Sequence, residues 1–228
     1  MIRWEAPGPY VVGFTTRVGG VSEGPYASLN LGARGDDPAH VAENRRLACE
    51  SLGLDASLLS LNRQRHSPTV HRAEPGIRDE SGDGLWSDVP GQSMLALAAD
   101  CVPIAIAATD GAPRLAVLHA GWRGLAEGVV ESGVRALGDV TTAAAVGPSV
   151  GPCCYEVGPE VSARFDADLT KDRILDLWTA AERALRRAGV RVVERVDLCT
   201  RCNPELFFSH RRSGTKRGAQ GLIGAVVG

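Results

Sequence analysis

One cysteine and one histidine stand eighteen residues apart in this sequence, each inside a short distinctive motif. Cys101 lies in Ala-Asp-Cys-Val-Pro, and His119 begins His-Ala-Gly-Trp-Arg-Gly. Two apolar runs, 104–108 and 115–118, separate them and flank the turn 110–113. Paired strands joined by a tight turn would bring both side chains to one rim of a sheet. A thiolate beside an imidazole is suited to metal binding or to nucleophilic catalysis.

A second histidine, His66, completes a possible set of three metal ligands with Cys101 and His119. One thiolate and two imidazoles leave a fourth tetrahedral position for water or substrate, as in catalytic zinc sites. Zinc lowers the pKa of its bound water to about 7 and so supplies hydroxide at neutral pH. Spacing alone leaves a plainer interpretation open, in which the cysteine is a small buried side chain and both histidines are hydrogen-bonded core residues.

Four further cysteines form a vicinal pair, Cys153 and Cys154, and a Cys-x-x-Cys motif, Cys199 to Cys202. Such a motif can be a redox pair or half of a zinc knuckle. A structural zinc site normally needs a second spaced pair, and the vicinal cysteines are not spaced. Pro204 follows too closely for a redox helix to begin at the motif. We therefore expect all four cysteines to be structural, in packed loops, with no complete metal-ligand set among them.

The composition is that of an ordinary globular protein that can bury a sizeable core, with 44% apolar and 23% charged residues. The net charge of −2 carries no basic excess, which argues against a nucleic-acid partner, although basic residues gather at 211–217. No apolar run is long enough to cross a membrane, and the N-terminus does not resemble a secretion signal. We expect a cytoplasmic protein with reduced cysteines, and a monomer is favoured.

Hydrophobic periodicity predicts strands and helices that do not alternate strictly, which favours an α+β fold over a doubly wound sheet. No repeat or linker divides the chain, so residues 1–228 are expected to form a single domain. The predicted strands are 10–16, 58–61, 93–99, 104–108, 115–118, 143–146, 190–196, 207–208 and 222–227, the predicted helices are 38–52, 124–137, 157–165 and 174–188, and the predicted loops include 17–30 and 74–84.

Three arginines stand alone in loops rich in glycine or histidine, namely Arg17, Arg123 and Arg211. A guanidinium in such a loop can hold an anion through two hydrogen bonds. Arg123 stands four residues after His119, at the start of the predicted helix 124–137, where unpaired backbone N–H groups also favour an anion. No dinucleotide or P-loop fingerprint is present, so a cofactor of that kind is not expected.

The residues of these motifs and their order along the chain resemble those of the YfiH-like, laccase-domain family of bacterial purine nucleoside phosphorylases. The resemblance covers nearly the whole chain. One segment, 215–218, reads Thr-Lys-Arg-Gly where the family more usually has Thr-Gly-Arg, which leaves the roles of the C-terminal arginines open. The matching segments are 15–32, 35–37, 44–45, 64–66, 99–103, 119–124, 147–158, 197–202 and 208–212.

The resemblance implies a mixed-sheet sandwich with two central β-sheets flanked by helices. It also implies that His66, Cys101 and His119 bind zinc, with copper the less favoured metal. The implied activity is phosphorolysis of adenosine, inosine, guanosine and methylthioadenosine, with purine nucleoside and phosphate as substrates, together with deamination of adenosine. An older naming of the family as copper laccases or polyphenol oxidases leaves phenol oxidation as an alternative.

This chemistry needs a proton shuttle for deamination, cationic groups for phosphate and polar groups for ribose. Arg123 has an alternative role, in which it forms an ion pair with Asp100 that only fixes the loop. The candidate side chains are Asp100 or Glu156 for the proton, Arg17, Arg123 and Arg211 for phosphate, and Asn30 for the ribose hydroxyl groups.

Other functions would use the same residues. A metal-free thiol hydrolase would have Cys101 as nucleophile and His119 as base. A multicopper oxidase normally needs several histidine-rich sites, whereas the chain has five histidines, of which His40 and His71 lie outside any motif. A binding protein that senses purines would show affinity for nucleosides without turnover.

Overall fold

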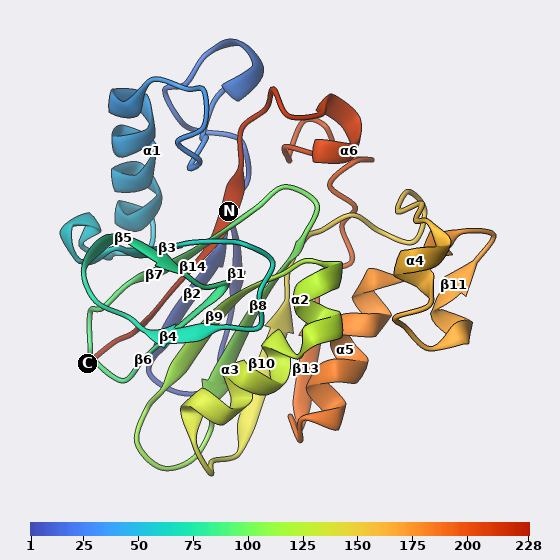
Figure 1. The fold of residues 1–228 in the computed structure, drawn as a ribbon. Coiled ribbons are helices and arrows are strands. Elements are labelled where there is room, and N and C mark those ends of the chain that lie inside the picture. The colour runs from blue at the N-terminus through green and yellow to red at the C-terminus, as the bar shows by residue number, and fades with distance from the viewer.

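The computed structural model consists of two six-stranded mixed sheets that pack face to face (Figure 1). It describes the backbone of residues 1–228 and all side chains except those of 77–79. In strand order, the first sheet contains β1 (Ile2–Trp4), β2 (Tyr10–Phe14), β14 (Gln220–Val226), β7 (Met94–Ala98), β3 (Ser60–Arg63) and β5 (Gly76–Ser81). The second contains β13 (Val192–Arg195), β10 (Thr142–Val146), β8 (Val102–Ala108), β9 (Leu115–Ala120), β6 (Gly84–Ser87) and β4 (Val70–Arg72).

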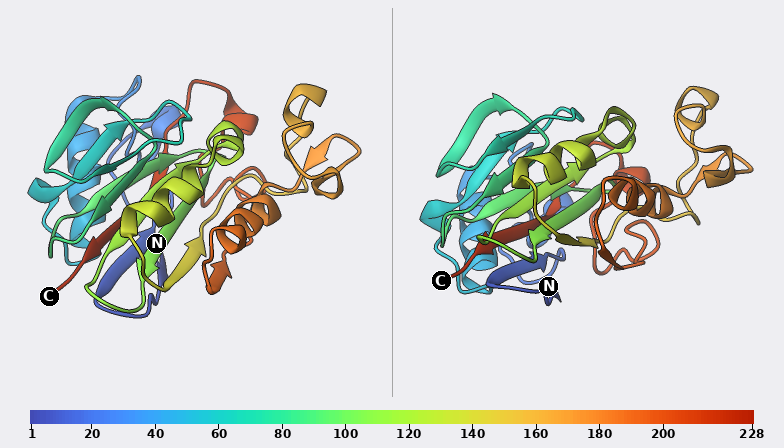
Figure 2. Two further views of the ribbon diagram at one scale, coloured as in Figure 1. Left: turned by 60° about the horizontal axis from the view of Figure 1, so that its bottom comes forward. Right: turned by 90° about the horizontal axis from the view of Figure 1, so that it is seen from below.

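The helices cover the two outer faces of this sandwich (Figures 1 and 2). Helix α1 (Pro38–Glu50) packs with apolar side chains of β3, β7 and β14 on the first sheet. Helices α3 (Val129–Leu137) and α5 (Leu177–Arg187) pack on β8, β9 and β10 of the second sheet. A third cluster fills the space between the sheets and includes Phe14, Val117 and Leu222. The predicted α+β fold with two central sheets flanked by helices is therefore confirmed.

Shorter elements complete the chain. The segment with α4 (Pro159–Ser162) and the hairpin of β11 (Thr170–Lys171) and β12 (Ile174–Leu175) projects from the body next to α5 (Figure 2). None of the helices in the described chain is both long and apolar enough to cross a membrane. The remaining elements are α2 (Trp122–Glu127), α4 (Pro159–Ser162), α6 (His210–Ser213), the 3₁₀ turns Gly24–Tyr26, Ala56–Leu58 and Ala167–Leu169, and the strands β11 (Thr170–Lys171) and β12 (Ile174–Leu175).

Strand β14 occupies the middle of the first sheet, although it follows every other strand in sequence. It pairs antiparallel with β2 on one side and with β7 on the other. Strands β1 and β2 pair with each other, and within the sheet they reach the remaining strands only through β14. The first sheet therefore depends on a pairing between distant parts of the sequence.

The expected pairing of the two central apolar runs is confirmed, because β8 and β9 are antiparallel neighbours in the second sheet. Their register places Pro103 opposite His119 and Val102 opposite Ala120. Cys101, directly before β8, is thereby brought to the same end of the strand pair as His119. Both strands are fully buried, so this end of the sheet is a rigid base for a site.

Three predicted elements differ from the structure. The helix expected over 124–137 is two helices, because Gly128 adopts a left-handed conformation with φ of 89° and its N–H ends α2. The stripe of apolar residues continues across Gly128, so the sequence pattern does not reveal the break between the two helices. The loop expected over 74–84 contains β5, a parallel neighbour of β3 at the sheet edge. The strand expected at 207–208 is absent, because the backbone of Phe208 bonds the side chain of Gln220 instead of a neighbouring strand.

Other boundaries shift as well. The helix expected over 174–188 begins at Leu177, because residues 174–175 form β12 and the Asp176 side chain caps the helix at Thr179. The helix expected over 157–165 is shortened to α4.

Candidate functional site

The three predicted metal ligands meet at the end of the β8–β9 pair. Cys101 precedes β8, His119 is the penultimate residue of β9, and His66 lies in the loop after β3. The ligand atoms of the three side chains all lie within 4.8 Å of one another. Cys101 Sγ is 3.6 Å from His66 Nε2, and the two imidazole rings meet edge to face, with centroids 4.9 Å apart. A single metal ion could be held by this group.

A buried carboxylate, Asp83, supports two of the three ligands. Its Oδ1 lies 2.8 Å from Nδ1 of His119, which fixes the imidazole so that Nε2 faces the other ligands. The same carboxylate accepts hydrogen bonds from the backbone N–H groups of Arg65, His66 and Ser67. Burial alone would raise the pKa of Asp83, but these hydrogen bonds and the nearby His119 hold it well below its usual range. Metal-ligating histidines commonly donate to a carboxylate in this way.

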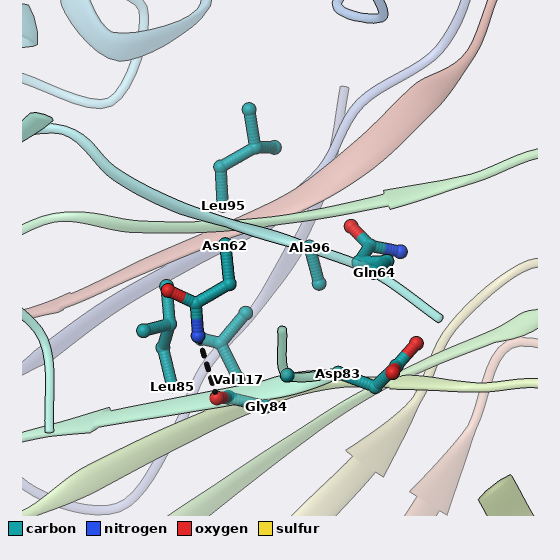
Figure 3. A pocket seen from close by; sticks show the side chains of 9 residues that line it. Asn62, Gln64, Asp83, Gly84, Leu85, Leu95, Ala96 and Val117 are labelled. Carbon is teal, nitrogen blue, oxygen red and sulfur yellow. Dashed lines mark hydrogen bonds between the residues drawn. The ribbon is translucent and has the colours of Figure 1, made fainter. Parts of the chain in front are cut away.

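A small pocket between the two sheets lies behind Asp83 (Figure 3). Asn62 and Ala96 come from the first sheet and Gly84 from the second, and Asn62 Nδ2 donates to the Gly84 carbonyl at 3.3 Å. Figure 3 shows the Asp83 carboxylate pointing away from Asn62. The pocket therefore borders the backbone that carries Asp83, while the carboxylate itself accepts hydrogen bonds from the loop 65–67 that contains His66.

Two residues of the site hold an unusual backbone conformation. His66 has φ of 62° and Asp100 has φ of 92°, both in the left-handed region that non-glycine residues rarely occupy. The hydrogen bond from the His66 N–H to Asp83 holds the first. The Asp100 carboxylate holds the second by accepting from Thr200 Oγ1 and from the Arg211 N–H, each at 2.6 Å. Strain of this kind clusters at functional sites, where the surroundings fix it.

Cys101 and His119 perturb each other's protonation. Burial alone would raise the pKa of the Cys101 thiol, but the charge of His119 and hydrogen bonds from both histidines lower it to about 6. Burial alone would lower the pKa of His119, but the charge of Cys101 and the hydrogen bond to Asp83 raise it to about 9. Near neutral pH the metal-free pair is therefore a thiolate beside an imidazolium, and the thiolate is the form that binds metals.

The backbone of Gly121 passes so close to His66 and Cys101 that a side chain at this position would collide with them. A methyl group at this position would lie 2.5 Å from Cδ2 of His66 and 3.0 Å from Sγ of Cys101. The glycine of His-Ala-Gly-Trp-Arg-Gly thus leaves space for two of the ligands.

A cavity of about 320 Å³ opens directly over the ligand group. Its apolar walls include Trp122 and Tyr155, and its cationic walls are Arg211 and Arg217. Arg211 lies over the Tyr155 ring at 4.7 Å and donates to the Glu156 carbonyl at 2.6 Å. The cavity is lined by His66, Ala99, Asp100, Cys101, Trp122, Tyr155, Leu177, His210, Arg211 and Arg217.

A second cavity of about 430 Å³ shares His210 and Arg217 with the first. Arg217 donates from Nη1 to the Gly218 carbonyl at 2.9 Å, while its Nε is buried without a hydrogen-bond partner. Burial lowers the pKa of Arg217, and the charges of Asp100 and Cys101 oppose this. Arg217 is half-buried, and a guanidinium in the wall of a cavity is suited to an anionic ligand.

The other predicted binding residues lie outside the wall of the first cavity. Arg17 donates to the carbonyl groups of Ala27 and Pro204. Arg123 is exposed and lies over the Trp122 ring at 4.9 Å, rather than pairing with Asp100.

Two polar candidates have partners of their own. Asn30 is buried, donates to Asp36 and accepts from the Ala219 N–H, and it lines the second cavity. The Glu156 carboxylate forms an exposed ion pair with Arg173. Of the predicted proton and anion groups, the first cavity therefore brings together Asp100 and Arg211.

Sequence reasoning missed Asp83, Tyr155, His210 and Arg217 as residues of the site. Asp83 lies in a polar, glycine-rich stretch that carries no spacing signal, so only the fold connects it to His119. Tyr155 and His210 do stand inside the motifs 147–158 and 208–212, and that position was the available signal. Arg217 belongs to the basic cluster that composition alone had singled out.

The four remaining candidate ligands form a second group, which corrects the expectation that they contain no complete metal-ligand set. The Sγ atoms of Cys153, Cys154, Cys199 and Cys202 all lie within 4.8 Å of one another. The expectation is wrong because it treated the vicinal pair as unable to complement the Cys-x-x-Cys motif. Sequence spacing does not show that the two segments run side by side.

Comparisons with known proteins agree on one family. The family model described as multi-copper polyphenol oxidoreductase laccase matches residues 11–226. The purine nucleoside phosphorylase PA4543 of Pseudomonas aeruginosa is 39% identical over 92% of this chain and 91% of its own. The purine nucleoside phosphorylase YfiH of Escherichia coli is 34% identical over 93% of both chains. The crystal structure of YlmD from Geobacillus stearothermophilus superposes with a TM-score of 0.90 at 31% identity, covering 99% of this chain and 94% of that one.

Proposed function

The chain belongs to the multi-copper polyphenol oxidoreductase laccase family, and from this membership and the geometry of its site we propose that it is a zinc-dependent purine nucleoside phosphorylase. One observation carries the proposal. Two of the three candidate metal ligands, His66 and Cys101, line the same cavity as two guanidinium groups, which would bring a nucleoside and an anion together.

Zinc fits the ligand group on its donor chemistry, since one thiolate and two imidazoles are ligands that zinc prefers. The Asp83–His119 hydrogen bond orients one imidazole as metal sites require. His66, Cys101 and His119 would hold the ion. When bound, it would act as a Lewis acid toward a substrate oxygen or nitrogen.

In phosphorolysis, a phosphate oxygen attacks C1′ of the ribose while the bond from C1′ to the purine nitrogen breaks. We assign the phosphate to Arg211 and Arg217, because both guanidinium groups line the cavity. The indole of Trp122 offers the purine a planar apolar surface in the same cavity. Arg123 then acts indirectly by lying over Trp122.

We propose the same site for deamination of adenosine, with inosine, guanosine and methylthioadenosine as further substrates of phosphorolysis. Asp100 is the better proton shuttle of the two predicted, because it lines the cavity while Glu156 pairs with Arg173. Asn30 would contact the ribose only from the second cavity, whose wall it forms.

The test is an assay of the zinc-loaded protein with adenosine or inosine, with and without phosphate, followed by chromatography of the products. We expect free purine base and ribose 1-phosphate only when phosphate is present. Conversion of adenosine to inosine without phosphate would establish the deaminase. Binding of nucleoside with no product under either condition would contradict the proposal and leave a purine-binding protein.

One observation favours a second candidate, a metal-free thiol hydrolase. Cys101 Sγ and an imidazole nitrogen of His119 lie within 4.8 Å, and the charge of His119 lowers the pKa of the thiol, as a cysteine nucleophile and its base require. Activity after treatment with a chelator distinguishes the two candidates, because a metal-free hydrolase would keep its turnover. Phenol oxidation is less well supported: the two ligand groups found among the described side chains contain two histidines in total.

A further inference from the structure

Four cysteine sulfurs from two distant segments converge beside the active-site cavity. Cys202 Sγ lies 3.5 Å from Cys153 Sγ and 3.3 Å from Cys154 Sγ. With Cys199, all four sulfurs lie within 4.8 Å of one another. This four-cysteine group has no part in the reaction proposed above and shares no ligand with the first group.

We propose that Cys153, Cys154, Cys199 and Cys202 bind a second zinc ion in a closed structural site. Zinc bound to four thiolates is tetrahedral with Zn–S distances of about 2.3 Å, which places the sulfurs about 3.8 Å apart. The two separations from Cys202 are slightly shorter than that value, and all four sulfurs lie within 4.8 Å of one another. Because all four positions are filled by protein, no position is left for water or substrate.

The backbone holds the two segments together independently of any metal. Ser149 and Cys199 form a parallel bridge, and the Thr200 N–H donates to the Ser149 carbonyl at 3.0 Å. The Gly151 N–H donates to Cys199 Sγ at 3.3 Å. A backbone N–H that points at a sulfur favours the thiolate over the thiol. The fold thus brings the Cys199 sulfur into the group with a hydrogen bond that would stabilise its charge.

A cation explains the whole group better than a disulfide does. The distances do not select one disulfide partner for Cys202, since Cys153 and Cys154 lie almost equally near, whereas one zinc ion uses all four sulfurs. Four thiolates this close would repel one another unless a cation neutralised them, and each thiol releases its proton when it binds zinc. Cys153 and Cys202 are exposed, so an ion can reach the site from solvent.

The position of the site gives it a structural task. Cys154 directly precedes Tyr155, and Thr200, next to Cys199, donates to Asp100. A zinc ion here would tie the segment of Tyr155 to the segment that holds the backbone of Asp100. It would thereby stabilise one wall of the cavity without contacting a substrate.

Metal content of the purified full chain is the first test. Protein stripped under reducing conditions is reloaded with Zn²⁺, freed of excess ion and measured by mass spectrometry of the metal. We expect two zinc ions per wild-type chain and one in the double variant Cys199→Ser, Cys202→Ser. Cys49→Ala is the matched control, because Cys49 is buried in α1 away from both groups, and it should keep two.

A second test uses the wild-type chain alone, so it holds even if the double variant fails to fold. Stripped protein is alkylated with and without zinc, and the modified cysteines are mapped by peptide mass spectrometry. Zinc should protect all four cysteines of the group, and Co²⁺ should produce intense thiolate-to-metal charge-transfer bands. An equal zinc content of the wild type and the double variant, equal alkylation with and without zinc, or a disulfide to Cys202 in the zinc-loaded protein would overturn the proposal. None of these readouts depends on phosphorylase activity.

Discussion

The two ligand groups of this molecule differ in how their donor atoms are held and in what lies next to them. The first has three ligands at the end of buried strands, an imidazole oriented by Asp83, and a cavity of about 320 Å³ over it. The second has four sulfurs on two loops joined by backbone hydrogen bonds. From this contrast we infer that three ligands beside a cavity (the open group) leave a coordination position for a substrate, whereas four ligands between two loops would join those loops.

The largest expected difference between the groups is in activity. Cys101→Ala removes a ligand of the open group, which should cost several kcal/mol of transition-state stabilisation, or on the order of 10³-fold in kcat/KM for phosphorolysis. Steady-state kinetics with inosine and phosphate measures this, and circular dichroism checks that the variant is folded. Cys49→Ala should keep full activity. Undiminished turnover by Cys101→Ala would show that the reaction does not need the open group.

Asp83→Asn tests whether the open group depends on its buried support. Asparagine keeps the size of the side chain but removes the charge that holds His119, so the zinc dissociation constant should rise about 10- to 100-fold. Competition with a chromogenic chelator measures the change for this first zinc ion. Asp88→Asn, which alters only an ion pair with Arg72 near the surface, is the matched control. An unchanged zinc affinity in Asp83→Asn would show that the carboxylate only shapes the loop.

Two arginines are candidates for binding phosphate, and substitution of each one distinguishes between them. Arg217→Ala should remove charge-assisted hydrogen bonds of about 1.5–3 kcal/mol, which raises the KM for phosphate about 10- to 100-fold. Arg123→Ala loses only an exposed contact with Trp122, so its effect should stay below about fivefold. Phosphate titration at saturating inosine measures both. If Arg123→Ala has the larger effect, the phosphate binds instead at Arg123, at the start of α2.

Gly121→Ala tests the space beside the open group. The added methyl group would overlap His66 and approach Cys101, and overpacking of this kind costs about 1–3 kcal/mol, on the order of tenfold in zinc affinity. Gly124→Ala is the control, because its methyl group would meet Val129 at 3.4 Å and the residue lies in a helix. The control should bind zinc normally. Equal affinities for the two variants would show that the ligand group tolerates a shift of His66.

The smallest expected effect is a difference in thiol reactivity after metal removal. Cys101 has a pKa of about 6, whereas burial and neighbouring thiols raise the pKa of Cys153 and Cys154 above the ordinary thiol value. The thiolate is the reactive form, so Cys101 should be alkylated first at pH 7, and its rate should fall as the pH drops through about 6. Peptide mapping after brief iodoacetamide treatment measures the order. Earlier labelling of Cys153 would reverse the predicted contrast.

The features that could be predicted from the sequence are those that depend on local patterns of residues. The pairing of β8 and β9 follows from two apolar runs and a turn, and with it the approach of Cys101 to His119. Asp83 could not be predicted, since its role depends on strands of both sheets bringing a glycine-rich loop under β9. The four-cysteine group was missed for the same reason, because a bridge between Ser149 and Cys199 joins its halves. The break at Gly128 was hidden by an apolar stripe that continues through it.

The central place of β14 in the first sheet has a consequence for how the protein is made. During synthesis β1 and β2 emerge first, yet their partner in the sheet emerges after every other strand. Until then β2 and β7 each expose an unpaired edge, which invites aggregation with other nascent chains. Until residues 220–226 have been synthesised, the second sheet can therefore assemble while the first cannot close.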